Sequence, residues 1–145
     1  MKYIEAPDEY LGSEKSLFLG GGISNCPDWQ KEIVSQLEGL DLVILNPRRN
    51  NFDLANKSVR VAQIEWEFRH LRKATARSFW FPKETLCPIT LYELGTYSSQ
   101  NGLFIGIHPK YQRREDIEEQ TKLVRPDIKL VYSLDDLAKQ ISKFF

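Results

Sequence analysis

The chain alternates between short, continuous apolar runs and longer segments in which apolar residues recur at helical spacing. Short runs that are apolar at successive positions are typical of strands buried on both faces of a sheet. Five runs of this kind lie at 16–19, 41–45, 78–81, 102–107 and 128–132. We therefore predict five strands in a mostly parallel sheet.

Helical periodicity fills most of the chain between and after these runs. The predicted helices are the stretch between Asp28 and Gly39, residues 59–74, the stretch that Pro88 opens, residues 112–124, and the stretch after Ser133. Asn25 or Pro27–Asp28 is expected to cap the first helix, and Ser133 begins an S-x-x-D capping box before the last one. Residues 1–15 and 52–58 have neither pattern, and we expect them to be irregular.

Strands that alternate with helices indicate an α/β fold with helices on both faces of the sheet. A doubly wound, flavodoxin-like arrangement with strand order 2-1-3-4-5 suits five strands, and residues 1–145 form one domain in this reading. In that order the loops after the first and third strands meet where ligands bind in open α/β sheets. Residues 20–25 and 82–93 are therefore predicted to line one crevice.

Composition and charge narrow the classes of function. Twenty basic and twenty acidic residues cancel, so nothing indicates a nucleic-acid surface. No apolar run approaches the roughly 20 residues of a membrane span, and the acidic N-terminus is unlike a signal peptide. Cys26 and Cys87 are isolated, without metal-ligand spacing. We predict a cytoplasmic protein without a metal site.

Two loops carry groups that suit an anionic or sugar ligand. Gly20, Gly21 and Gly22 run into Ile23 and Ser24 and form a turn whose backbone N–H groups can bind phosphate or sugar oxygens. A glycine turn without a ligand is at least as common, and this one lacks the G-x-G-x-x-G and P-loop patterns. Arg48 and Arg49 follow the second strand. They could hold a phosphate or carboxylate, or they could belong to a solvated loop and pair with nearby acids, and we weigh the two interpretations equally.

The predicted helices carry candidate acids. Glu93 follows the third strand and lies between apolar neighbours, so we expect it to be half-buried near the crevice. Either Glu65 or Glu67, in the middle of the 59–74 helix, can face the same space, although Glu65 is spaced to pair with Arg69 on the surface. His70 is expected at the surface or helix end rather than as a catalytic base.

The motifs FLGGGI, LNPRR, QIEWE, FWFPKETLCPITLYELG, HPKYQRREDIEEQ and SLDDL occur in this order. Together they resemble the nucleoside 2-deoxyribosyltransferase-like family over nearly the whole chain. The resemblance implies the flavodoxin-like fold and cleavage of the N-glycosidic bond of a 2′-deoxynucleoside or its 5′-monophosphate. The family's nucleophile is the glutamate of an E-L-G sequence, which is Glu93 here. A carboxylate suits that role because it captures an oxocarbenium-like sugar carbon.

Three positions depart from the pattern of the better-studied transferases. The aspartate expected before the third strand is absent at Thr75, the aspartate six residues before the nucleophile is Cys87, and the tyrosine of the first strand is Phe18. Two functions therefore stay open. One is an enzyme that transfers the deoxyribosyl group to a base or to water, and the other is a module that binds a nucleotide or ribosyl metabolite without turnover.

For the enzyme we predict Glu93 as nucleophile and Glu84, or else Glu67, as proton donor. The predicted substrate-binding residues are Gly20, Gly21, Gly22, Ile23, Ser24, Arg48, Arg49, Glu67, Phe81, Cys87 and Ile89. The resemblance implies a nucleoside or nucleotide as partner, no cofactor, and a homo-oligomer in which residues 109–124 are a plausible contact. The accepted base and the need for a 5′-phosphate stay open.

Overall fold

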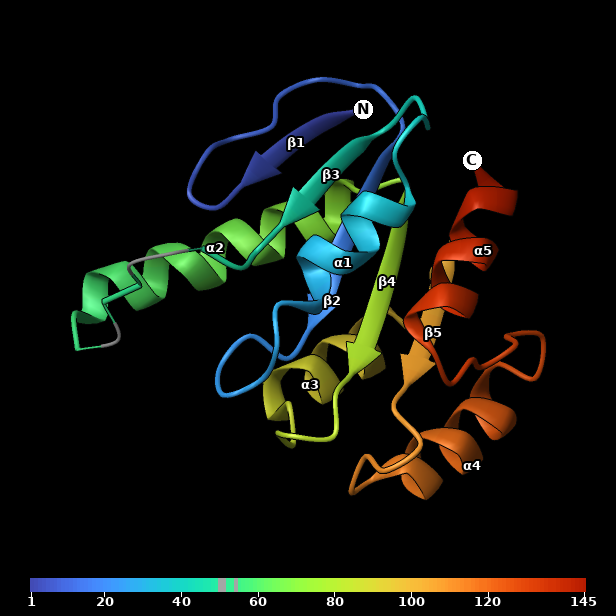
Figure 1. The fold of residues 1–145 in the computed structure, drawn as a ribbon. Helices are drawn as coiled ribbons and strands as arrows, with labels where there is room; N and C mark the ends of the chain where they lie inside the picture. The colour runs from blue at the N-terminus through green and yellow to red at the C-terminus, as the bar shows by residue number, and fades with distance from the viewer. Residues whose placement is uncertain (50–51, 54) are drawn as a thin grey trace.

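A computed structural model, which describes residues 1–49, 52–53 and 55–145, has a five-stranded parallel sheet of order β1-β3-β2-β4-β5 (Figure 1). The strands are Lys2–Glu5 (β1), Ser16–Gly21 (β2), Val43–Asn46 (β3), Ala76–Phe81 (β4) and Leu103–Ile107 (β5). Every pairing in the sheet is parallel. The predicted flavodoxin-like α/β class is confirmed.

Helices cover both faces of this sheet. They are Trp29–Gln36 (α1), Lys57–Lys73 (α2), Pro88–Tyr97 (α3), Arg114–Val124 (α4) and Leu134–Phe144 (α5). Helices α1 and α5 lie in front of the sheet in Figure 1, and α2 and α3 lie behind it. No helix in the described part of the chain is long and apolar enough to cross a bilayer.

The helix starts follow the predicted signals. The Asp28 carboxylate accepts a hydrogen bond from the Lys31 N–H at 3.1 Å, so Asp28 rather than Asn25 caps α1. Ser133 Oγ accepts from the Asp136 N–H at 3.1 Å at the start of α5. Pro88 is the first residue of α3, where a missing N–H leaves no helical hydrogen bond unmade.

The two outer strands differ from the prediction. Residues 1–15 were expected to be irregular, but Lys2–Glu5 pairs with β3 at the edge of the sheet. The strand has only four residues and is charged at both ends, as is common for an edge strand. So short and polar a segment gives only a weak strand signal in the sequence. At the other edge, residues 128–132 were expected to be a strand, but Val131 alone bridges to Gly106. The Lys129 carbonyl accepts from the Gln140 side chain at 2.9 Å.

Side chains along each central strand alternate between the two faces and build two separate cores. Phe18, Phe79 and Phe81 face α2, α3 and α4. Leu17, Leu19 and Trp80 face α1 and α5 and belong to the second core. Because ligand loops follow these same strands, the alternation also decides which side chains reach the site.

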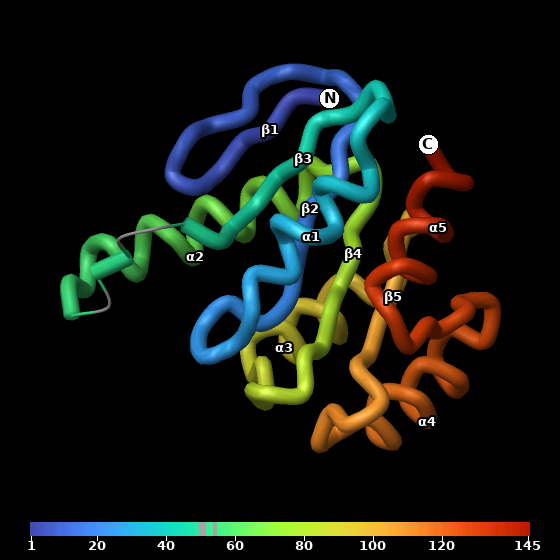
Figure 2. The backbone as a smooth tube through the Cα atoms, in the orientation of Figure 1, coloured from blue at the N-terminus to red at the C-terminus, as the bar shows by residue number. Residues whose placement is uncertain are grey.

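Residues 5–10 form an N-terminal strap that lies against α2 (Figure 2). Trp66 Nε1 donates to the Asp8 carbonyl at 2.8 Å, and the Tyr10 N–H donates to His70 Nε2 at 3.2 Å. Lys73 Nζ donates to the Tyr10 carbonyl at 3.0 Å. The strap therefore fixes α2 at successive turns of the helix.

His70 is buried beneath this strap and stacks on Trp66 with ring centroids 3.9 Å apart. Of its two predicted places the surface is therefore wrong, whereas the helix end is right, because His70 lies in the last turn of α2. Its Nε2 accepts the Tyr10 N–H, which leaves the proton on Nδ1 to donate to the Trp66 carbonyl at 2.8 Å. Burial lowers the pKa of His70 and keeps the ring neutral. The strap covers the imidazole ring, and no local sequence pattern predicts the contact between Tyr10 and His70, which are 60 residues apart.

Candidate functional site

A cavity of about 310 Å³ lies at the carboxyl ends of β2 and β4. The chain leaves β2 toward β3 and later returns to β4 on the other side of β2, which is the switch point where open α/β sheets bind ligands. The walls come from the loops after β2, β3 and β4 and from one face each of α2 and α3. They are Phe18, Gly20, Gly21, Gly22, Ile23, Ser24, Pro47, Phe52, Arg60, Gln63, Ile64, Glu67, Thr85, Cys87, Pro88, Ile89, Thr90 and Glu93.

The glycine turn is packed against the loop that follows β4. A Cβ at Gly22 would lie 3.0 Å from both Cys87 Sγ and Thr85 Cγ2, so only glycine lets the two loops approach this closely. The Gly22 carbonyl accepts from Trp29 Nε1 at 2.8 Å, which fixes the turn from the side of α1. The turn thus presents backbone to the cavity and is held from two directions.

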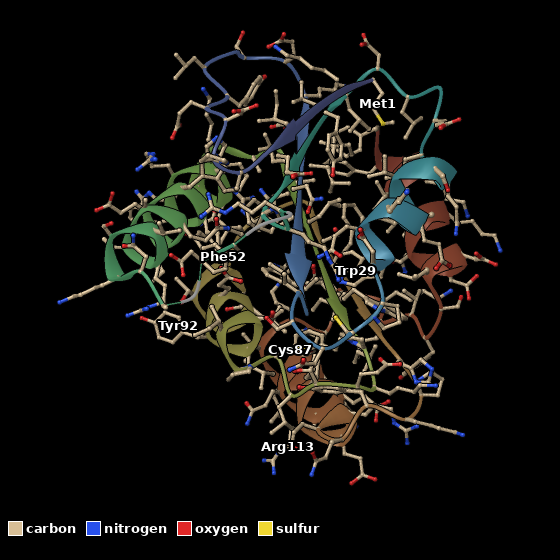
Figure 3. The ribbon with its side chains drawn as sticks, turned by 60° about the vertical axis from the view of Figure 1, so that its left-hand side comes forward. Met1, Trp29, Phe52, Cys87, Tyr92 and Arg113 are labelled. Carbon is tan, nitrogen blue, oxygen red and sulfur yellow. The ribbon has the colours of Figure 1, made fainter. Side chains whose placement is uncertain are left out.

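Cys87 lies at the N-terminal end of α3, close to this turn (Figure 3). Its backbone is left-handed, with φ 48° and ψ 53°, which is uncommon for a residue other than glycine. Burial raises the pKa of its thiol to about 12, so the cavity wall carries a neutral thiol here. Cys26 is also a free thiol.

Glu93 lies in the second turn of α3 and reaches the cavity. Burial, and to a lesser extent the nearby Glu67 charge, raise the pKa of its carboxyl to about 8. A carboxyl with this pKa is mostly protonated at neutral pH. This is the kind of perturbed acid that functional sites contain.

Glu67 reaches the same cavity from α2. Burial raises the pKa of this carboxyl too, whereas the hydrogen bond from Gln63 and the charge of Arg49 lower it. Of the two acids, Glu67 has the partners that favour the ionised form. Glu65, the other candidate on α2, is exposed and lies 4.0 Å from Arg69, as its spacing predicted.

Gln63 joins the β3 loop to Glu67. Its Nε2 donates to the Pro47 carbonyl at 2.9 Å and to Glu67 Oε1 at 2.8 Å. Its Oε1 is buried and has no hydrogen-bond partner among the described residues. An orphaned acceptor in a cavity wall suits a ligand that brings an N–H or O–H donor.

Several predicted residues lie elsewhere. Arg48 donates to the Cys26 and Pro27 carbonyls at 3.1 and 2.9 Å and braces the loop before α1, outside the cavity. Arg49 lies over the Phe52 ring at 4.6 Å and lines a different hollow.

Two more predicted site residues, Glu84 and Phe81, also lie outside the cavity. Glu84 is exposed, 4.0 Å from Lys83. Phe81 is fully buried and packs on Tyr111, with ring centroids 5.3 Å apart.

The cavity also contains residues that sequence reasoning did not assign to it. These are Pro47, Phe52, Arg60, Gln63 and Ile64, whereas Thr85, Pro88 and Thr90 belong to the predicted 82–93 wall. Gln63 was within reach of the sequence, because it lies one helical turn before Glu67 and shares its face. Pro47 directly follows the second predicted strand, so its place at the carboxyl end of that strand could also have been predicted.

A family model described as nucleoside 2-deoxyribosyltransferase-like matches residues 14–111, which are 98 of the 145 residues. The chain belongs to the nucleoside 2-deoxyribosyltransferase-like family. A search of curated proteins found no match. The family match contains every residue that lines the cavity, whereas strand β1, the strap and helix α5 lie outside it.

The three positions that depart from the family pattern have different surroundings. Phe18 and Cys87 line the cavity. Thr75 lies away from it and exchanges hydrogen bonds with Ser16, accepting on Oγ1 from the Ser16 N–H at 3.0 Å and donating its own N–H to Ser16 Oγ at 3.2 Å. Thr75 thus has a structural role in the sheet, whereas Phe18 and Cys87 are placed where they could contact a ligand.

Proposed function

We propose that this chain cleaves the N-glycosidic bond of a 2′-deoxynucleoside or its 5′-monophosphate, with Glu93 as the nucleophile. One observation carries the proposal: the glutamate of the family's E-L-G sequence reaches a cavity of about 310 Å³ at the carboxyl ends of the strands. That volume is in the range of small-molecule sites.

The chemistry follows from the residues around Glu93. Its carboxylate attacks C1′ of the sugar as the bond to the base breaks, and the base takes the bonding electron pair. The ester that results is then opened by water or by a second base. Phe18, Ile64 and Ile89 offer apolar surface for a planar base, while the glycine turn offers backbone N–H groups to sugar or phosphate oxygens.

The second candidate is a module that binds such a ligand without turnover. The raised pKa of Glu93 favours it, because a protonated carboxyl is a poor nucleophile. Phe18 and Cys87 supply less hydrogen bonding than a tyrosine and an aspartate would.

The deciding experiment is chromatographic detection of free base released from a panel of deoxynucleosides and their 5′-monophosphates, with and without an acceptor base. Glu93→Ala is run beside the wild type. Release that depends on Glu93 supports the enzyme, and dependence on an acceptor base distinguishes transfer from hydrolysis. A wild type that binds nucleotides, as seen by a raised melting temperature, but releases no base supports the binding module.

We propose in addition that the chain is a homo-oligomer with a contact on α4. Leu123 is 77% exposed and Val124 is 57% exposed, at the end of this helix. An apolar groove of about 360 Å³ lies between α3 and α4. Light scattering after size-exclusion chromatography measures the mass, and Leu123→Glu is expected to lower it.

A further inference from the structure

We infer that acid releases the N-terminal strap from helix α2, because neutral His70 holds the Tyr10 N–H and protonated His70 cannot. The strap thereby makes the α2 wall of the cavity sensitive to pH. Its attachment is a property of the folded chain and does not depend on the proposed reaction. Residues 5–10 also precede the residues that the family model matches.

Four hydrogen bonds among the described residues join the strap to α2, and one of them has a partner that titrates near neutral pH. In three, a side chain of the helix donates; these are Trp66 to the Asp8 carbonyl at 2.8 Å, Arg69 to Glu9 at 2.6 Å and Lys73 to the Tyr10 carbonyl at 3.0 Å. In the fourth, His70 Nε2 accepts the Tyr10 N–H at 3.2 Å. Indole, guanidinium and ammonium groups keep their protons between about pH 5 and 8, whereas an imidazole gains one in this range.

The His70 ring is fixed, so rotation cannot accommodate a second proton. It stacks on Trp66, with ring centroids 3.9 Å apart and an interplanar angle of 22°. Nδ1 lies 2.8 Å from the Trp66 carbonyl, which can only accept, so the neutral ring carries its proton on Nδ1 and offers the Nε2 lone pair to Tyr10. In the charged ring both nitrogens are donors, and Nε2 then faces another donor.

Helix α2 and the sheet favour the neutral ring. Burial lowers the pKa of His70 most, and the positive charges of Arg69 and Lys73 also lower it. The hydrogen bond to the Trp66 carbonyl acts in the other direction. From the sheet, Phe18 packs on Trp66 with ring centroids 6.2 Å apart and brings no charge. The closed strap therefore resists the proton.

The strap supplies one group that favours the charged ring. Glu9 Oε2 lies 3.9 Å from His70 Nε2, while Oε1 of the same carboxylate accepts from Arg69 at 2.6 Å. The Tyr10 hydroxyl stays neutral in this range, because burial raises its pKa, and it donates to Glu14 at 2.8 Å. Glu9 and the Tyr10 N–H compete for one nitrogen, so a charged ring that gains Glu9 must lose Tyr10.

Release of the strap affects the cavity through α2. Trp66 Nε1 loses the Asp8 carbonyl, and the next residue of the helix, Glu67, lines the cavity together with Gln63. An indole N–H that loses its acceptor destabilises the packing around it, so the middle of α2 is expected to loosen when the strap leaves. Acid is therefore expected to loosen the wall that carries Glu67.

Hydrogen exchange measured by mass spectrometry at pH 7.5, 6.5 and 5.5 tests the attachment without substrate. Each exchange rate is divided by the intrinsic rate at that pH, which leaves the protection due to structure. Protection of peptides from residues 1–15 and 60–73 is expected to fall by up to about tenfold per pH unit below 6.5, the ordinary pKa of histidine, because opening binds one proton. Peptides from α5, on the other face of the sheet, are expected to keep their protection.

Two variants assign the response to one ring. In His70→Gln the amide oxygen can accept the Tyr10 N–H but cannot gain a proton in this range, so strap protection is expected to be the same at all three pH values. His108→Gln is the matched control, because it removes the other histidine of the chain, which follows β5. This control is expected to respond to pH as the wild type does.

A second measurement needs no change at His70. In His108→Gln, long-range ¹H–¹⁵N NMR spectra contain the signals of one imidazole, and they show which nitrogen carries the proton and the pH at which the ring becomes charged. The proton is expected on Nδ1 at pH 7.5, with the midpoint of titration below 6.5. Strap protection is expected to fall between pH 6.5 and that midpoint.

Three results would overturn the acid release. These are strap protection that stays constant relative to α5 down to pH 5.5, an unchanged pH response in folded His70→Gln, and a neutral ring that carries its proton on Nε2. Loss of strap protection without any loss in residues 60–73 would overturn the effect on the cavity. Because no substrate is present, a chain that releases no base contradicts the proposed function and leaves these outcomes as they are.

Discussion

The two faces of the sheet are built on different principles. On the face of α1 and α5, the strand side chains and the helices close into an apolar core in which Leu17, Leu19, Ile33, Ile44, Leu137 and Ile141 are fully buried. On the face of α2 and α3, the core is interrupted at the carboxyl ends of the strands by a cavity with two half-buried acids. Strand β2 contributes to both cores, since Leu17 and Leu19 face the first and Phe18 faces the second.

This difference indicates where the fold gains stability and where it gives some up. The closed apolar face contributes burial, and its buried Ser78 and Gln30 side chains both have hydrogen-bond partners. The open face keeps two carboxyls and the Gln63 carbonyl partly desolvated, which lowers stability and leaves them ready for a ligand. The first face is therefore expected to respond to mutation in stability, and the second in activity.

The open face also needs bracing that the closed face does not. Arg77 is buried there and donates to the Leu71 and Ala74 carbonyls at 2.6 and 2.9 Å, which satisfies the C-terminal end of α2. The N-terminal strap holds the same helix through Trp66 and His70. Both devices fix the helix that carries Gln63 and Glu67.

The largest effect is expected at Glu93. Glu93→Gln keeps the size of the side chain and removes the nucleophile, so base release should fall by more than about 1,000-fold. The melting temperature at pH 8 should stay the same or rise, because a neutral amide replaces a carboxyl that burial penalises. Chromatography and differential scanning calorimetry measure the two quantities. A variant that loses activity only because it unfolds would contradict the contrast between the faces.

The opposite response is expected from Leu19. Leu19→Ala leaves a void in the closed core and should lower the free energy of unfolding by about 2–5 kcal/mol. Base release per folded molecule should stay near that of wild type, because Leu19 does not line the cavity. Urea denaturation and a rate measured well below the melting temperature provide the comparison. A large loss of turnover in fully folded protein would mean that the faces are coupled.

Sequence reasoning recovered the parts of the fold and site that local patterns announce. The apolar runs placed β2, β3, β4 and β5, and Pro88 fixed the start of α3 and so the position of Glu93 at the cavity. The convergence of the glycine turn with the start of α3 followed from the sheet order.

What the sequence missed depends on partners that are distant along the chain. Strand β1 is short and polar, and it is a strand because β3 has an open edge. Residues 128–132 have a strand pattern, but a side chain from α5 takes one of their carbonyls. Arg48 suited an anion by type, and its actual partners are backbone carbonyls of another loop. Neither side-chain type nor spacing reveals such contacts.

A smaller effect is expected on the pH dependence of stability. The pKa of Glu93 is about 8 in the folded chain against an ordinary value of 4.5, so the folded state binds the proton more tightly. Stability from this group is complete below pH 4.5 and is lost as the pH rises toward 8, by at most about 1.4 kcal/mol per pH unit. Glu67 contributes with the same sign, because its pKa is raised too.

Urea denaturation between pH 6.5 and 8 isolates this effect. Below pH 6.5 the depressed pKa of His70 acts in the opposite sense, since the unfolded chain then binds a proton that the folded chain resists. Glu93→Gln should flatten most of the slope in the upper window. A wild-type stability that is flat from pH 6.5 to 8 would mean that the carboxyl is not desolvated in the folded protein.

The smallest effect sharpens the comparison, because it alters one helix cap on each face. Ser133 caps α5 on the closed face, and Asn56 caps α2 on the open one, with Oδ1 accepting from the Ser58 N–H at 3.0 Å. Ser133→Ala and Asn56→Ala should each lower the free energy of unfolding by about 1 kcal/mol. Only Asn56→Ala should also reduce turnover, because loosening the first turns of α2 shifts Gln63 and Glu67 against Glu93. Equal turnover in the two variants would mean that the strap and Arg77 alone position α2, and that its first turns carry no part of the site's geometry.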